Sequence, residues 1–115
     1  MRVLSVTAQK PCSTGSGVYL TEVVRSLAKI GVSQAVVAGV TREDRVDMPE
    51  GVTVYPVYFS SEKLPYPVVG MSDEMPYTST RYRDMTKEMA GQFKVAILEV
   101  LDEAIEKENP DIILC

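Results

Sequence analysis

The sequence contains no histidine, no tryptophan and only two cysteines, Cys12 and Cys115, in 115 residues. Because histidine is the commonest general base near neutral pH, catalysis would have to use carboxylates or residues outside this chain. The cysteines form no CxxC pair, and a zinc site without histidine would have to rely on carboxylates. The composition therefore predicts a reduced, cytoplasmic protein that binds no metal ion.

Excess positive charge and long apolar runs are absent as well. The 12 Lys and Arg residues are outnumbered by 16 Asp and Glu residues, and the formal net charge is −4. This balance argues against a nucleic-acid-binding surface, which needs a basic patch. No apolar run approaches the roughly 20 residues that span a bilayer. The length allows one small domain with one hydrophobic core.

Two short apolar segments, residues 3–7 and 35–40, are rich in β-branched residues and predict buried strands. Between them, apolar residues recur on one face of a helix that ends near Gly31, a residue suited to the left-handed position after a helix. These apolar residues are Leu20, Val23, Val24, Leu27 and Ala28. The segment therefore predicts a βαβ unit, whose crossover is right-handed in nearly every known case.

A third strand is predicted at residues 52–57, after a polar linker at residues 41–50. The linker is too short and too charged to predict a crossover helix. The strand therefore either pairs antiparallel or reaches a parallel edge through an extended loop. Pro56 favours an edge strand, where its missing N–H removes no ladder hydrogen bond.

The C-terminal half predicts a long loop at residues 60–80, a long helix and a last strand. The helix is expected to begin near Ser79 or Thr80, either of which could cap it, and to stop before Asn109. Residues 111–115 predict a final buried strand. Together the elements predict a Rossmann-like three-layer α/β/α domain with a mainly parallel sheet, truncated after its fourth strand.

The segment Thr14-Gly15-Ser16-Gly17, between the first strand and the first helix, is the sharpest local signal for function. Glycines let a backbone approach a ligand closely, and the N–H groups at a helix N-terminus bind anions. We therefore predict that Thr14, Gly15, Ser16 and Gly17 bind substrate. The alternative is a tight strand-to-helix turn that binds nothing.

Two nucleotide-binding motifs do not fit this segment. Leu20 stands where the third glycine of the dinucleotide fingerprint belongs, and no acidic residue follows the second strand at Ala38-Gly39. A P-loop is excluded because no Gly-Lys-Ser/Thr follows. An NAD-dependent oxidoreductase is disfavoured on these grounds.

A second candidate segment, residues 65–77, combines two adjacent carboxylates with several Tyr, Met and Pro residues. Long loops within small domains are commonly functional or disordered. Ser72, Asp73 and Tyr77 are predicted to contact a sugar or an amphipathic acceptor. The alternative is a surface excursion without a ligand.

Several segments, in this order, carry a resemblance to a known family: residues 1–7, residues 14–20, L-A-x-x-G at residues 27–31, and N-P-D-I-I at residues 109–113. They resemble the N-terminal half of a family 4 glycosyltransferase of the GT-B fold, and residues 70–77 resemble a loop of one bacterial subgroup. The resemblance covers essentially the whole chain, and the order and spacing of the motifs support it.

The resemblance implies that residues 1–115 are the N-terminal, acceptor-side part of a transferase whose C-terminal domain binds most of a nucleotide-sugar donor. The implied acceptor is a sugar, a lipid or another small molecule, and no metal or other cofactor is needed. No catalytic residue is assigned within the chain, and the part alone is expected to be inactive. Peripheral membrane association of the full-length enzyme and self-association of the part are further expectations.

A different class of function stays open beside this one. The chain could be a stand-alone binding or regulatory α/β domain whose glycine segment holds a small anionic ligand. A second α/β pattern with paired glutamates in a longer sequence would favour the transferase.

Overall fold

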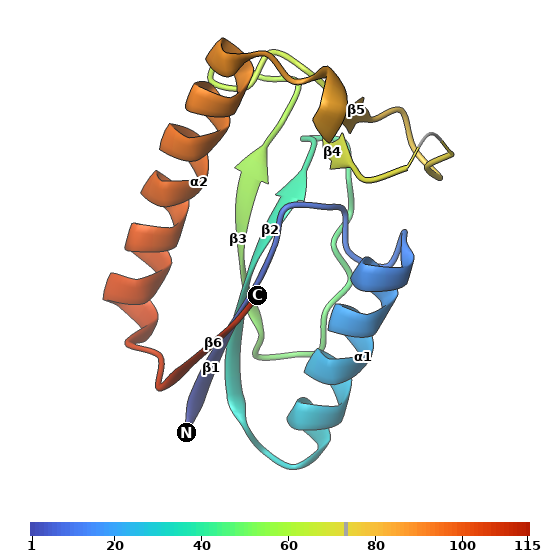
Figure 1. The fold of residues 1–115 in the computed structure, drawn as a ribbon. Coiled ribbons are helices and arrows are strands. Elements are labelled where there is room, and N and C mark those ends of the chain that lie inside the picture. The colour runs from blue at the N-terminus through green and yellow to red at the C-terminus, as the bar shows by residue number, and fades with distance from the viewer. Residues whose placement is uncertain (73) are drawn as a thin grey trace.

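The computed structural model describes residues 1–72 and 74–115, and its main element is a sheet of four parallel strands. The strands are β1 (Arg2–Thr7), β2 (Ser33–Val40), β3 (Thr53–Tyr58) and β6 (Ile112–Leu114), arranged in the order β3-β2-β1-β6. Helices α1 (Gly15–Lys29) and α2 (Lys87–Glu108) lie on opposite sides of this sheet (Figure 1). The predicted three-layer α/β arrangement with a mainly parallel, Rossmann-like sheet is confirmed.

Helix α1 begins and ends at residues suited to those positions. The side chain of Thr14, its N-cap, accepts a hydrogen bond from the N–H of Gly17 at 3.1 Å. At the other end, Gly31 has φ 79°, in the left-handed region. The N–H groups of Gly31 and Val32 donate to carbonyl oxygens in the last turn of α1. This ending is a Schellman motif and confirms the predicted role of Gly31.

The linker between β2 and β3 contains no helix, and β3 nevertheless pairs parallel to β2. Of the two alternatives that the sequence left open, the parallel edge reached through an extended loop is therefore correct. Val46, Met48 and Val52 from this connection pack against the core on the α1 side of the sheet. Pro56 lies on an outer strand, as predicted.

The second helix begins later than the sequence predicts. Thr86, not Ser79 or Thr80, is the N-cap of α2. Thr80 is held in extended conformation because its N–H donates to the carbonyl of Val68 at 3.0 Å and its hydroxyl donates to that of Pro67 at 2.7 Å. These tertiary hydrogen bonds prevent an earlier start, and no local sequence signal announces them.

A small second sheet precedes α2. It consists of β4 (Val69–Gly70) and β5 (Thr80–Arg81), which pair parallel, and the 3-10 helix η1 (Tyr82–Asp84) follows at once. No pattern in the sequence predicts this sheet. Figure 1 shows it above α1, beyond the end of the main sheet at which β2 and β3 terminate.

The last strand is exposed, although its sequence predicts a buried one. Ile112, Ile113 and Leu114 keep 40%, 44% and 40% of their surface accessible. Within the described ranges, β6 pairs with β1 alone and forms one edge of the sheet. Helix α2 packs mainly over β3, β2 and β1.

The sheet carries a different core on each face. The α2 side holds the larger one, which includes Leu4, Phe59, Leu64 and Val69. The α1 side holds Val24, Val36, Ala38 and Val40. Neither α1 nor α2 is long and apolar enough to cross a membrane, and no other helix in the described residues is either.

Candidate functional site

The glycine segment lies at the carboxyl edge of the sheet, which is the edge where the strands end. The sequence analysis assigns residues up to Gly17 to a loop, but Gly15, Ser16 and Gly17 form the first turn of α1. The hydroxyl of the Thr14 N-cap satisfies the N–H of Gly17, and this bond allows the helix to start there. Gly15 and Ser16 are exposed and Gly17 is buried.

Gln9 organises this first turn, and the sequence analysis missed it. Its side chain is buried, and its Oε1 accepts hydrogen bonds from the hydroxyls of Thr14 at 3.1 Å and Ser16 at 3.4 Å. A buried amide needs such partners, because an unpaired polar group away from water is costly. A polar residue two positions after a buried strand was the only signal in the sequence.

The glycines of the segment have different surroundings. A Cβ added to Gly17 would lie 2.5 Å from the carbonyl oxygen of Lys10 and 3.3 Å from the backbone nitrogen of Cys12. The space beside Gly17 is therefore occupied by the chain itself. A Cβ added to Gly15 would meet nothing within 4 Å. Gly15 and Ser16, rather than Gly17, leave the backbone of the first turn open to a ligand.

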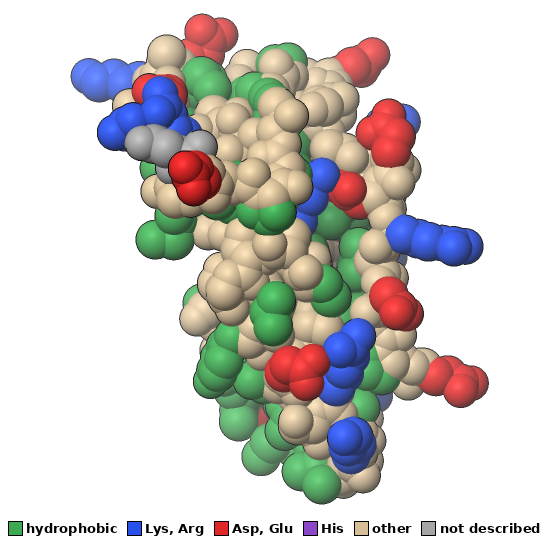
Figure 2. Space-filling view, turned by 90° about the vertical axis from the view of Figure 1, so that its right-hand side faces the viewer, with side chains coloured by type: hydrophobic (Ala, Val, Ile, Leu, Met, Phe, Trp, Pro, Cys, Tyr) green, Lys and Arg blue, Asp and Glu red, His purple; other side chains and the backbone are tan. Residues whose placement is uncertain are grey.

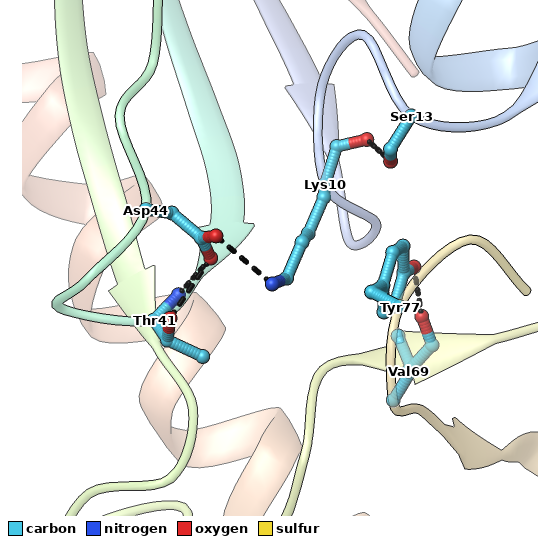
Figure 3. A network of polar contacts seen from close by, with 6 residues as sticks. All are labelled: Lys10, Ser13, Thr41, Asp44, Val69 and Tyr77. Carbon is cyan, nitrogen blue, oxygen red and sulfur yellow. Dashed lines mark hydrogen bonds and ion pairs between the residues drawn. The ribbon is translucent and has the colours of Figure 1, made fainter.

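Three segments that are distant in sequence meet at Lys10, as Figure 3 shows. The Nζ of Lys10 donates to Oδ1 of Asp44, which follows β2, at 2.9 Å. The same ammonium lies 5.0 Å from the ring centroid of Tyr77, which belongs to the segment between β4 and β5. The hydroxyl of Ser13 donates to the carbonyl of Lys10 at 2.5 Å. No motif in the sequence pointed to Lys10 or Asp44.

The Asp44 carboxylate is stabilised in its charged form. Burial alone would raise the pKa of Asp44, but the hydrogen bonds from the backbone and hydroxyl of Thr41 and the contact with Lys10 outweigh it and hold this pKa below its ordinary value. The N–H and hydroxyl of Thr41 reach Oδ2 at 2.7 and 3.0 Å. The carboxylate is therefore ionised at neutral pH and fixes the position of the ammonium group.

The second predicted segment contributes to the same edge in part. The hydroxyl of Tyr77 donates to the carbonyl of Val69 at 2.8 Å, and burial raises its pKa, so it stays protonated. Ser72 is exposed, and its hydroxyl donates to the carbonyl of Glu74 at 3.0 Å. Asp73, the third predicted residue, lies outside the described residues. Tyr77 thus meets the β1–α1 connection through Lys10, and among the described residues Ser72 makes no hydrogen bond to that connection.

Ser72 lines a separate open cavity of about 540 Å³ with Met71, Arg81, Tyr82 and Arg83. Burial raises the pKa of Tyr82, and its neighbour Gln9 partly offsets this effect. Gln9 therefore lies between the first turn of α1 and the wall of this cavity.

A crevice of about 310 Å³ lies between the ends of β1 and β6 and the first turns of α1. We call it the β1–β6 crevice; its walls include Ser5, Thr7, Ser16, Tyr19, Leu114 and Cys115. In the sheet, β2 and β3 lie on one side of β1 and β6 lies on its other side. The strand order therefore reverses between β1 and β6, at this crevice. In open α/β sheets, ligands bind at such a switch point, outside the carboxyl ends of the strands.

Tyr19 is an exposed aromatic residue of the crevice, with 73% of its surface accessible. On the side of the molecule that Figure 2 presents, hydrophobic side chains gather at the lower left, whereas charged ones stand out at the top, along the right and in the lower centre. A mainly apolar crevice that also includes serine and threonine residues and an exposed aromatic ring can bind a polar ligand that has an apolar face.

Metal chemistry has no evident location, since the described residues include no group of three or more carboxylate, cysteine or histidine side chains that could hold an ion. The sequence matches no known family model and no curated protein.

Proposed function

We propose that this chain is the acceptor-side domain of a glycosyltransferase that takes a sugar from a nucleotide-sugar donor. The observation that supports it most is the β1–β6 crevice, which opens at the switch point of a parallel sheet beside the first turn of α1. The order of motifs from residues 1–7 to residues 109–113 agrees with this proposal.

The first turn of α1 would contact the ligand through its backbone. The first N–H groups of a helix have no partner within the helix, and Thr14 satisfies only the one from Gly17. The N–H groups of Gly15 and Ser16 lie in an exposed turn, at the positive end of the helix dipole. They can donate to a phosphate oxygen or to a sugar hydroxyl.

The side chains of the β1–β6 crevice would select the acceptor. Ser5, Thr7 and Ser16 line the crevice, and Tyr19 adds an aromatic ring against which the apolar face of a sugar or lipid can pack. We assign no catalytic residue to this chain. The donor would be held mainly by a second domain, which faces the carboxyl edge in the proposed enzyme.

Binding by the isolated chain tests this proposal. A panel of nucleotide sugars, free sugars and lipid-linked sugars is titrated and followed by amide shifts in ¹⁵N NMR spectra. We expect at least one acceptor class to shift Ser16 and Tyr19, without nucleotide release in a parallel turnover assay. Tyr19→Ala should weaken this binding about tenfold, through lost contact area. Tyr58→Ala, at an exposed tyrosine on the far edge strand, is the matched control.

Two results would contradict the proposal: no member of the panel shifts the crevice residues, or Tyr19→Ala and Tyr58→Ala weaken binding equally. The stand-alone module holding a small anion makes a different prediction at the same site. The exposed first turn of α1 supports it, and inorganic phosphate would then shift Gly15 and Ser16 while no sugar does.

A further inference from the structure

The ammonium group of Lys10, at the carboxyl edge, has more N–H donors than its one hydrogen bond uses. An ammonium group has three N–H donors. Among the residues that the structure describes, Asp44 alone supplies a hydrogen-bond acceptor to Lys10, at 2.9 Å, while the ring of Tyr77 covers another side of the group. The side chain retains 20% of its accessible surface. It is therefore held in one place and still open to a further oxygen ligand.

Both carboxylate oxygens of Asp44, in contrast, accept hydrogen bonds from the protein itself. Its Oδ1 accepts from Lys10, and its Oδ2 accepts from both the N–H and the hydroxyl of Thr41. The carboxylate positions the ammonium group and also neutralises part of its charge. An anion that approached Lys10 would meet repulsion from Asp44, so the carboxylate would oppose binding as well as preorganise it.

A second lysine–carboxylate pair lacks this arrangement. Lys63 and Glu99 lie 2.6 Å apart, but their side chains are 72% and 54% exposed. No ring contact to Lys63 is found in the described residues, and the pair lies beside α2 and β3, away from α1. Exposed pairs of this kind contribute little to stability. Lys63 therefore provides a matched control for Lys10.

We propose that Lys10 binds an oxyanion, the phosphate or carboxylate group of a ligand at the carboxyl edge, and that Asp44 tunes its affinity. The backbone of Lys10 lies against the first turn of α1 at Gly17, which anchors the residue at the carboxyl edge. This inference deepens the proposed function, on which it rests only for the identity of the rest of the ligand.

The test uses simple ions at constant ionic strength. Inorganic phosphate and glucuronate are titrated separately into the chain, and the backbone amides of residues 10–16 and 41–44 are followed by NMR. Saturable shifts with phosphate assign a phosphate site, and saturable shifts with glucuronate alone assign a carboxylate site. Lys10→Gln should weaken binding about tenfold or more, because a charge-assisted hydrogen bond is lost. Lys63→Gln should leave it unchanged.

The variant Asp44→Asn distinguishes a role of the Lys10–Asp44 pair in ion binding from a purely structural role. The amide still offers an oxygen to Thr41 but removes the competing charge, so we expect anion affinity to rise about threefold or more. A purely structural pair would respond differently: Lys10→Gln and Asp44→Asn would lower the melting temperature together without changing ion binding. That result would overturn the proposal. An equal loss of ion affinity in Lys10→Gln and Lys63→Gln would also overturn it.

Lys10→Arg guards against a folding defect, because it keeps the charge and should keep most of the affinity. If Lys10→Gln unfolds, loss of ion binding in a folded Lys10→Arg would overturn the proposal. The oxyanion site and the transferase function can be disproved separately. Ion binding at Lys10 with no response to any sugar would leave the oxyanion site standing and remove the transferase.

Discussion

The carboxyl edge of the sheet has two halves of opposite character. In the half at β1 and β2, the backbone around residues 8–12 fills the space beside Gly17 and Gly39, and the Lys10–Asp44 pair joins the two connecting loops. In the half at β6, Leu114 and Tyr19 are exposed and line the β1–β6 crevice. The comparison teaches that the closed half supplies rigidity and the open half supplies accessible surface.

The largest effect is expected from a substitution that disrupts the packing of the closed half. A side chain at Gly39 would overlap the carbonyl of Ala8 and press on the ring of Phe59. Because a backbone carbonyl cannot rotate away like a side chain, Gly39→Val should lower the free energy of unfolding by more than about 3 kcal/mol. Urea denaturation followed by circular dichroism measures this loss. A change below 1 kcal/mol, estimated as roughly the cost of a tolerated core swap, would contradict the packing argument.

Gly17→Ala should have a smaller effect of the same kind. The added methyl would lie 2.5 Å from the carbonyl of Lys10, while alanine favours the helix by about 1 kcal/mol over glycine. We expect a net loss of stability of about 1–2 kcal/mol, because overpacking exceeds the gain in helix propensity. Thermal unfolding measures it. A stability increase would show that the loop moves aside freely.

The open half predicts self-association. Edge strands with exposed apolar side chains promote contact with other chains, and Ile112, Ile113 and Leu114 are all exposed. Sedimentation velocity across a dilution series should show dimers or larger species at high concentration. Ile113→Lys should shift the protein to monomer without lowering its melting temperature. A strict monomer at every concentration would remove this prediction.

Acid should weaken the closed half selectively. Since the pKa of Asp44 is lower in the folded chain, its stabilisation is complete above the pKa of an unfolded aspartate, about 3.9, and is lost as pH falls through the folded value. The pair is partly exposed, so we expect a contribution of at most about 1 kcal/mol. Wild type and Asp44→Asn should differ in unfolding free energy at pH 7 and converge below about pH 3. A difference in unfolding free energy that stays constant down to that pH would show that it does not come from the charge of Asp44.

The smallest effect on stability is expected at Gly15. Its Cβ would meet no atom within 4 Å, so Gly15→Ala should leave stability unchanged or raise it by up to about 1 kcal/mol. If the first turn of α1 contacts a ligand through its backbone, the same methyl should weaken binding in the NMR titrations. If Gly15→Ala leaves ligand binding unchanged, the ligand does not contact the backbone of the first turn of α1 at Gly15.

The fold was more predictable than the site because its signals are local. The helical spacing from Leu20 to Ala28 and the left-handed Gly31 depend only on near neighbours in sequence, and both were predicted. The start of α2 was not, because the bonds from Thr80 to residues 67 and 68 compete with a helix that the local sequence favours. The burial of β6 was also wrong, since apolarity does not show what covers a strand.

The sequence by itself determined the alternation of strands and helices, the βαβ unit and the position of the glycine segment, because periodicity and backbone preferences act over a few residues. Only the tertiary structure decided which glycine is closed and which is open, and that Gln9, Lys10 and Asp44 belong to the site. The contact between Lys10 and Asp44 joins positions 34 residues apart, and the contacts of Gln9 and Gly17 depend on how the connection between β1 and α1 folds. Such contacts arise when parallel strands bring their ends to one edge, and no local pattern encodes them.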